Sequence, residues 1–186
     1  MSPDREPNDG MLGDEEYFES SKSEAKVFDA NVLHEPMSVL PTAEPLLYGP
    51  SHPVSDAMQD MQNKRRGCVL VTEDGTSATP LLGIFTERDV LRRIVGRGRN
   101  PATLPLREVI TRDPECLPLE ATVAWVLNKM ALGGFRHVPI VDDGGRPVFV
   151  VSVRDVVQFL VDFFPRDVLN MPPEFGADKT RTREGA

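Results

Sequence analysis

The sequence predicts a mixed α/β (α+β) fold built from two copies of one β-α-β-β-α unit, related by a pseudo-twofold axis. One observation is a repeat: the run CVLVTED at Cys68 returns as HVPIVDD at His137, 69 positions later. A second is that helical and strand patterns follow the same order in both copies. A third is size, because a unit of about 60 residues is small for independent stability, whereas two units bury their sheets against each other.

Each copy begins with a short strand and an amphipathic helix. The strand is expected within PMSVLPTAEPLLY in the first copy and within VITRDPECLPL in the second. The helix is predicted because apolar residues recur at i, i+3, i+4 and i+7, which places them on one stripe. The stripe residues are Val54, Ala57, Met58 and Met61 in the first copy and Val123, Val126, Leu127 and Met130 in the second.

Two buried strands and a closing helix complete each copy. The strands are joined by the acidic glycine turns EDG and DDGG, which are typical of hairpins. The segment TSATP lengthens the first turn, so the offset between the copies falls to 66. At that offset the closing helices are expected to match, with Thr86, Asp89, Val90, Leu91, Ile94 and Val95 corresponding to Ser152, Asp155, Val156, Val157, Leu160 and Val161.

A hydroxyl residue and an aspartate three positions later open each closing helix: Thr86 and Asp89, then Ser152 and Asp155. One interpretation is structural, because a hydroxyl caps a helix and an acidic residue suits its first turn. The other is functional, because a helix N-terminus attracts anions and a carboxylate accepts two hydrogen bonds from a sugar diol. Gly83 lies inside an apolar strand, which marks the close approach of a ligand or of another backbone.

Together these motifs resemble the CBS (cystathionine-β-synthase) domain pair, or Bateman module. The resemblance covers about residues 35 to 165 and is carried by GIFTERDVL, VVSVRDVV, FRHVPIVDDGG and VITRDPECLPLEATVAWVLNKM. It implies two clefts between the sheets and a homodimer. It also implies a regulatory sensor of an adenosine compound (AMP, ADP, ATP or S-adenosylmethionine) that signals through conformational change or an unidentified protein partner.

The resemblance also implies which residues bind the ligand. The hydroxyl residue contacts phosphate or ribose, and the aspartate of one copy holds the ribose hydroxyls together with strand residues of the other. The favoured cleft then contains Gly83, Ile84, Thr86, Arg88, Asp89, Thr111, Pro114, Arg136 and His137. The candidates in the second cleft are Ser152, Arg154 and Asp155.

The second cleft is expected to be the weaker one. Gly67 and Cys68, which carry no charge, would face it, and Phe149 stands where the family pattern has glycine, so its side chain is expected to obstruct a nucleotide. For Arg136 and His137 in the favoured cleft, a structural role is an alternative to ligand binding. Arg136 would instead pair with the acidic turn, and His137 would be a satisfied strand histidine.

Two other functions are alternatives to that of a sensor, and the charge of the chain bears on one of them. A net charge of −8 argues against general binding to nucleic acid or anionic lipid. A local basic run is either a solvated helix end or a patch that faces phosphate or a partner; it comprises Arg88, Arg92, Arg93, Arg97 and Arg99. The alternatives are a nucleic-acid accessory protein that uses this run and a structural scaffold that has lost its ligand.

No catalytic or metal-binding motif stands out. The three histidines lack metal-ligand spacing with Cys68 or Cys116, and Walker A, G-x-S-x-G and H-E-x-x-H motifs are absent from the sequence. The sequence therefore predicts neither an enzyme nor a metal site nor a catalytic cofactor. Two cysteines in apolar runs, no run of 18 apolar residues and no secretory signal predict a cytoplasmic protein.

The expected organisation has four parts. Residues 1–28 form a flexible acidic arm, because they have too few large apolar residues to offset the entropy of ordering. Residues 29–100 and 101–170 are the two repeats. Residues 171–186 form a second flexible tail.

Overall fold

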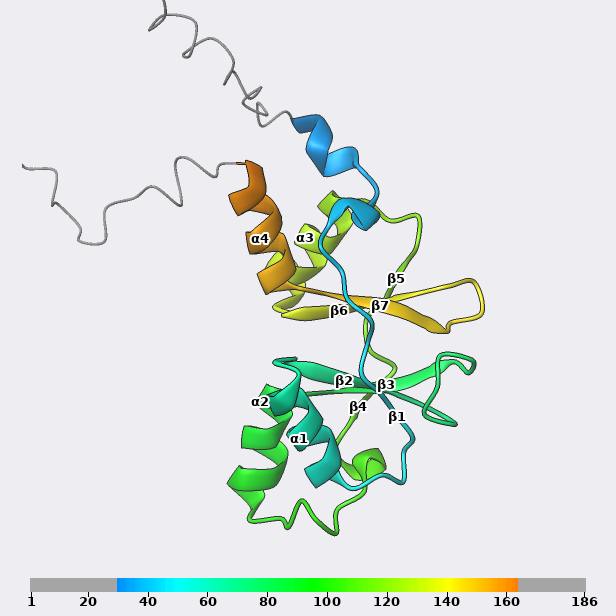
Figure 1. The fold of residues 1–186 in the computed structure, drawn as a ribbon, viewed down its shortest axis with the longest axis vertical. Helices are drawn as coiled ribbons and strands as arrows, with labels where there is room; N and C mark the ends of the chain where they lie inside the picture. Colours follow the sequence, from blue (N-terminus) through cyan, green and yellow to red (C-terminus); the bar gives the residue numbers. More distant parts are fainter. Residues whose placement is uncertain (1–29, 164–186) are drawn as a thin grey trace, which may run out of the picture.

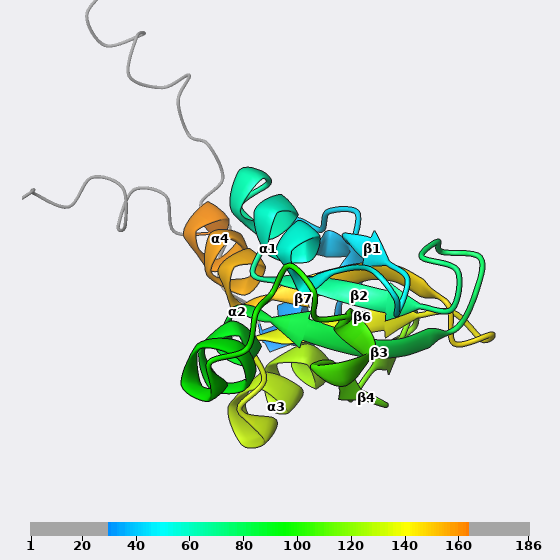
Figure 2. The same cartoon turned by 90° about the horizontal axis from the view of Figure 1, so that it is seen from below.

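The computed structural model describes residues 30–163, which form two stacked α/β units (Figure 1). The predicted flexible arm 1–28 and tail 171–186 lie outside the described residues. In each unit a small sheet faces the other unit, and helices cover its outer side (Figure 1). Figure 2 shows the same molecule from below, with helices α1 to α4 gathered at one end of the sheets and the hairpin turns at the other.

The first unit has a four-stranded sheet in the order β1-β2-β3-β4. Its elements are β1 (Leu47–Tyr48), α1 (Val54–Asn63), β2 (Cys68–Thr72), β3 (Leu81–Thr86), η5 (Leu106–Glu108) and β4 (Thr111–Arg112). β1 pairs with β2 in parallel, which requires a crossover such as α1, and β2, β3 and β4 pair antiparallel. The closing helix follows β3 in three parts, α2 (Glu87–Asp89), the π-helix η3 (Val90–Ile94) and η4 (Val95–Arg97).

The second unit has a three-stranded sheet in the order β5-β6-β7. Its elements are η1 (Ala30–His34), η2 (Met37–Val39), β5 (Leu117–Pro118), α3 (Val123–Gly133), β6 (His137–Val141), β7 (Pro147–Ser152) and α4 (Val153–Phe163). β5 pairs with β6 in parallel, and β6 pairs with β7 antiparallel. The unit therefore repeats the β-α-β-β-α order of the first.

Strand register confirms the predicted repeat. Cys68 pairs with Thr86 in the first hairpin, and His137 pairs with Ser152 in the second. Each hairpin is irregular at the same point, after Val71 in β2 and after Ile140 in β6. The two hairpins therefore correspond residue by residue, and the predicted mixed α/β tandem repeat is confirmed.

The predicted apolar stripes of α1 and α3 face the two cores. Val54, Ala57 and Met61 are buried in the first core, and Val123 and Val126 are buried in the second. The remaining stripe residues, Met58, Leu127 and Met130, are partly buried against the same cores.

The predicted match of the closing helices holds at Leu91 and Val157, which are both exposed, and is wrong at Ile94. Ile94 is 3% exposed, whereas its predicted counterpart Leu160 is 40% exposed and Phe159 is 8% exposed. Ile94 of the first repeat is therefore equivalent to Phe159 of the second, and the correspondence shifts by one residue. The π-helix explains the shift, because a π turn accommodates one extra residue within a helix.

Each core includes a segment from beyond its own repeat. Met37 and Leu40 belong to the second core, although they precede the first repeat's strands. Leu106, Val109 and Ile110 belong to the first core, and β4, which follows them, adds the last strand to the first sheet. The predicted boundary between residues 100 and 101 stays a prediction, but packing crosses it in both directions.

Within residues 30–163, no helix is long and apolar enough to span a bilayer.

Candidate functional site

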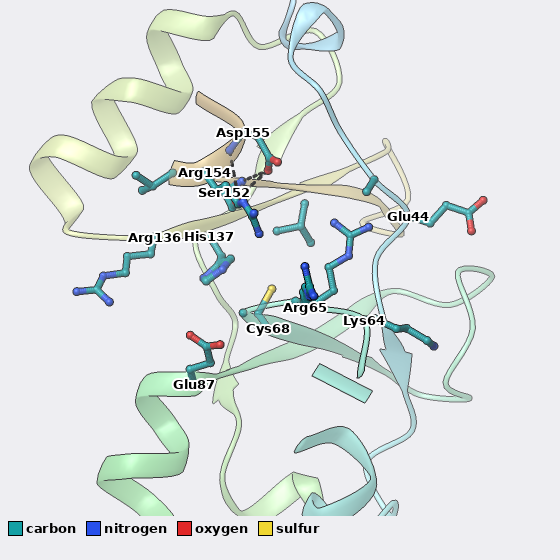
Figure 3. A pocket seen from close by; sticks show the side chains of 15 residues that line it. Glu44, Lys64, Arg65, Cys68, Glu87, Arg136, His137, Ser152, Arg154 and Asp155 are labelled. Atoms are coloured by element: carbon teal, nitrogen blue, oxygen red, sulfur yellow. Dashed lines mark hydrogen bonds between the residues drawn. The ribbon is translucent and has the colours of Figure 1, made fainter. Parts of the chain in front are cut away.

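Two cavities lie between the units, one beside each helix-opening aspartate. The larger, here called the Asp155 cavity, has a volume of about 550 Å³ (Figure 3). The smaller, the Asp89 cavity, has a volume of about 360 Å³. Both volumes are within the range of small-molecule sites.

The structure gathers the predicted site residues around these two spaces. Eight of the nine candidates for the favoured cleft line the Asp89 cavity: Ile84, Thr86, Arg88, Asp89, Thr111, Pro114, Arg136 and His137. The candidates for the second cleft, Ser152, Arg154 and Asp155, line the Asp155 cavity.

Gly83 is the candidate that lines neither cavity. A Cβ atom at this position would lie 2.8 Å from Ile110 Cδ1 and 2.8 Å from the Thr111 carbonyl oxygen. Gly83 is directly paired with Arg112 in the register of β3 and β4. The close approach that this glycine allows is therefore that of the neighbouring strand, not of a ligand.

The two aspartates cap their helices in the same way. The backbone N–H and the hydroxyl of Thr86 donate to Asp89 Oδ2 at 2.9 and 2.8 Å. The same two groups of Ser152 donate to Asp155 Oδ2, both at 2.7 Å. The structural interpretation of both motifs is thus correct. In each motif, one oxygen of the aspartate is used to cap the start of the helix.

The second oxygen distinguishes the two sites. Asp89 Oδ1 lies 3.1 Å from Arg93 Nε in an ion pair, and Asp89 is 8% exposed. Asp155 Oδ1 has no hydrogen-bond or salt-bridge partner within residues 30–163, and Asp155 is partly exposed to the cavity that it lines. Only the Asp155 carboxylate therefore offers an oxygen without a partner in the described chain.

The Asp155 cavity carries a surplus of cations that the sequence analysis did not predict. Gly67 and Cys68 do line it, but five cationic side chains stand against three carboxylates. The cations are Lys64, Arg65, Arg66, Arg136 and Arg154, and the carboxylates are Glu44, Glu87 and Asp155. Figure 3 shows that the labelled lining residues come from both units, with Arg65, Cys68 and Glu87 from the first and His137, Ser152 and Asp155 from the second, while the side chains of Glu44, Lys64 and Arg136 extend outward. In the part of the chain that the structure describes, the four arginines form no salt bridge.

Arg65 holds an unusual backbone conformation beside this cavity. Its φ is +52°, in the left-handed region, and the equivalent position 69 residues later is Gly134 with a φ of +66°. Glycine is the usual residue at such a helix end, because a side chain there is strained. A strained arginine beside a cavity is a candidate functional residue. The sequence signal was available in the run KRRGC, which aligns with GGFRH at the 69-residue offset.

Phe149 does not obstruct the Asp155 cavity. Its side chain packs against the second core, on the face of β7 that meets the helices. Strand alternation turns the next residue, Val150, to the opposite face, where it lines the cavity. The expected obstruction of this cleft is therefore wrong.

A shared wall separates the two cavities. Gly67, Glu87, Arg136 and His137 line both of them. A Cβ atom on Gly67 would lie 2.6 Å from His137 Nε2, so this glycine makes room for the imidazole ring. Burial lowers the pKa of His137, and Glu87 and Asp155 oppose that effect in part.

Ion pairs in the described chain bear on two of the structural alternatives for the predicted residues. Arg136 forms no salt bridge with the acidic turn in residues 30–163, and Asp142 of that turn pairs with Arg146 at 2.6 Å. In the basic run, Arg93 pairs with Asp89 and Arg99 pairs with Glu108, so those two arginines are neutralised.

The cysteines and the acidic residues give no sign of redox or metal chemistry in the described chain. Cys68 and Cys116 are free thiols, and burial raises their pKa to about 12 and about 11. Both are therefore protonated at neutral pH. Among residues 30–163, no group of three His, Cys, Asp or Glu side chains is arranged to hold a metal ion.

Comparisons with known proteins agree with this architecture. The chain matches the CBS domain family in two stretches, residues 38–96 and 106–162. It is 34% identical over 110 residues to the CBS domain-containing protein CBSCBSPB3 of Arabidopsis thaliana, covering 59% of this chain and 19% of that protein. The chain thus spans about a fifth of the length of this relative.

Solved structures share the fold over most of the described residues. A conserved protein of Pyrococcus horikoshii is 26% identical, with a TM-score of 0.60, and the match covers 68% of this chain and 92% of that one. A CBS-domain containing protein of Agrobacterium tumefaciens is 29% identical, with a TM-score of 0.53, and the match covers 62% and 87% of the two chains.

Proposed function

Because this chain belongs to the CBS domain family, we propose that it is a regulatory protein that binds an adenine nucleotide and reports it through a change of shape. The Asp155 cavity is the principal binding site in this proposal. The observation that supports it most is the Asp155 Oδ1 atom, which has no partner in the described chain and borders a cavity rich in arginines without ion pairs.

Asp155 suits the ribose. Its Oδ2 atom is fixed by two hydrogen bonds from Ser152 at 2.7 Å, so the carboxylate is held in one orientation before a ligand arrives. An ionised carboxylate oxygen can accept two hydrogen bonds, which matches the two hydroxyls of a vicinal diol. Preorganisation of this kind lowers the entropic cost of binding.

The arginines suit the phosphates. Arg65 and Arg66 come from the first unit and Arg154 from the second, and all three line the cavity, so an anion bound by them contacts both units. Guanidinium groups bind phosphate through paired, charge-assisted hydrogen bonds. S-adenosylmethionine carries positive groups in place of phosphate, so this cavity favours AMP, ADP or ATP over it.

Apolar groups that line the same cavity suit the adenine ring. Ala43, Cys68 and Val150 line it, and a protonated thiol packs like a small hydrophobic residue. Ala43 also pairs with Val150 across an isolated β-bridge, which holds the two residues next to each other.

The site explains how binding is reported. Its walls belong to both units, so a ligand that prefers one arrangement of the units shifts the population towards it. The proposal assigns the response to a homodimer or to a protein partner in the cytoplasm, without enzymatic activity. Exposed apolar side chains on the helices offer such a surface; they include Leu91, Val95, Trp125 and Val157.

Isothermal titration of the full chain with AMP, ADP, ATP and S-adenosylmethionine tests the proposal. We expect one adenine nucleotide to bind per chain in the Asp155 cavity, and D155N to weaken binding by about 100-fold. The matched control is D143N, which removes an exposed carboxylate outside both cavities. A wild-type chain that binds none of the four compounds favours the scaffold alternative, and equal binding by D155N rejects the assigned site.

A further inference from the structure

The first repeat's aspartate is already engaged by a cation of the same chain. Arg93 Nε lies 3.1 Å from Asp89 Oδ1, while the two groups of Thr86 occupy Asp89 Oδ2. Both carboxylate oxygens therefore have partners, and only 8% of Asp89 is exposed. A sugar diol that approaches Asp89 meets a carboxylate without a vacant oxygen.

Arg93 is held on its other side as well. Nη1 donates to the Val109 carbonyl oxygen at 2.5 Å, and Nη2 donates to Thr111 Oγ1 at 3.0 Å. All three nitrogens of the guanidinium are thus used. Val109 belongs to the first core and Thr111 to β4, so Arg93 connects the closing helix of the first unit to the segment that carries the last strand of the same unit.

The helix geometry that presents Arg93 is found only in the first of the two closing helices. The residue four positions after Asp89 lies in the π-helix η3, and it faces the aspartate. The residue four positions after Asp155 is Phe159, which is buried in the second core. In the first repeat Ile94 fills that core position instead, so the π turn is what frees Arg93 to face Asp89.

The numbers of charged side chains that line the two cavities also favour the Asp155 cavity for an anionic ligand. The Asp89 cavity has four arginines and four carboxylates, and the Asp155 cavity has five cations and three carboxylates. The ion pair withdraws one of those four arginines and the carboxylate best placed for a diol. The Asp89 cavity is therefore the poorer site for an anionic nucleotide while the pair persists.

We infer that Arg93 is a latch, an internal occupant of the Asp89 carboxylate that excludes the sugar of a second nucleotide. The inference rests on the proposed function, because it takes the diol as the group that each aspartate binds. With the latch closed, the chain binds one nucleotide; with the latch open, it binds two. Arg93 is in this sense a specificity-determining residue, because it makes two repeated sites unequal.

The first experiment counts bound nucleotides. Isothermal titration with AMP, and separately with ATP, is carried out on the full-length wild type, R93Q and R97Q. We expect one site per chain in the wild type, two in R93Q and one in R97Q, the matched control on the same helix. R93K keeps a positive charge within reach of Asp89, so we expect it to restore the single site.

The second experiment assigns the additional site. R93Q/D155N is expected to bind one nucleotide, and adding D89N to that variant is expected to abolish binding. Thermal melting of each variant without ligand shows that it is folded. If R93Q melts below the assay temperature, T111V serves instead, because it removes the Nη2 acceptor and loosens the same latch.

The outcomes separate the latch from the proposed function. One site in the wild type and one in folded R93Q overturns the latch and leaves the proposed function standing. Two sites in the wild type also overturn it, because the Asp89 cavity then fills with Arg93 in place. No binding by either chain overturns both, and a second, Asp89-dependent site in R93Q supports the latch.

Discussion

The two aspartate sites begin from the same local chemistry and end differently. In each, a hydroxyl residue and its backbone N–H bind one oxygen of an aspartate three positions later. The other oxygen meets Arg93 in the first repeat and an open, basic cavity in the second. Since the caps are alike, the difference arises in the turn of helix that follows. The hydroxyl and aspartate motif therefore predicts the helix cap. The turn of helix that follows it determines whether the second oxygen of the aspartate is available to a ligand.

The largest expected effects concern the strand position that differs most between the repeats. Gly83 corresponds to Phe149, and the first repeat has no room for a side chain where the second needs one. We expect G83A to lower the free energy of unfolding by about 1–3 kcal/mol, because the new Cβ atom displaces β4. F149A is expected to cost about 2 kcal/mol, less than a fully buried phenylalanine. Urea unfolding measures both, and an unchanged midpoint for either variant contradicts the assigned packing.

The shared wall gives the next prediction. G67A places a Cβ atom against His137 and pushes the ring into one of the two cavities. We expect AMP affinity to fall by about tenfold, equivalent to about 1.4 kcal/mol, with little change in unfolding free energy. G144A, in an exposed turn away from both cavities, is the control for titration. Wild-type affinity in G67A shows that the wall is not part of the site.

Substitutions at Arg65 and Gly134 test whether the backbone strain at Arg65 serves ligand binding. R65G is expected to raise the unfolding free energy by about 1 kcal/mol, because glycine tolerates the left-handed backbone. G134A is expected to lower it by about 1 kcal/mol for the opposite reason. R65G should at the same time weaken AMP binding by severalfold. Thermal melting and titration check these signs, and a stabilised R65G with full affinity removes Arg65 from the site.

His137 gives the smallest effect, a dependence of stability on pH. Burial lowers its pKa in the folded chain, so the folded state favours the neutral ring. Its contribution to stability is present above the ordinary histidine pKa of about 6.5 and is lost as pH falls towards the lowered value. Between pH 7.5 and pH 5.5, we expect the unfolding free energy of the wild type to fall further than that of H137N. The difference between the two falls is expected to be below about 1 kcal/mol. H34N, at an exposed position, should follow the wild type in this melting series, and parallel curves for all three contradict the effect.

The sequence was most informative where period and spacing carry the signal. The hairpins, the helix stripes and the repeat follow from apolar periodicity, and the structure has them at the predicted positions. The gathering of Thr86 with Asp89 and of Ser152 with Asp155 was also predictable, because three-residue spacing across a helix start is a local property.

What could not be predicted depends on departures from the repeat. A π turn leaves no pattern in the sequence, so the role of Arg93 and the burial of Ile94 appear only in the structure. Strand alternation decides which way Phe149 faces, and the family pattern alone suggested an obstruction. The arginines at 65 and 66 were visible in the sequence, but their place in the cavity depends on how the helix end before β2 turns.

The exchange of core segments between the repeats has a consequence for synthesis on the ribosome. Met37 and Leu40 emerge early, but their partners in the second core, such as Val151 and Phe159, emerge more than a hundred residues later. At translation rates of about 5–20 residues per second, that delay is roughly 6 to 24 s. The nascent chain therefore carries this apolar segment without its partners during that delay, and the second unit closes only after α4 has been synthesised.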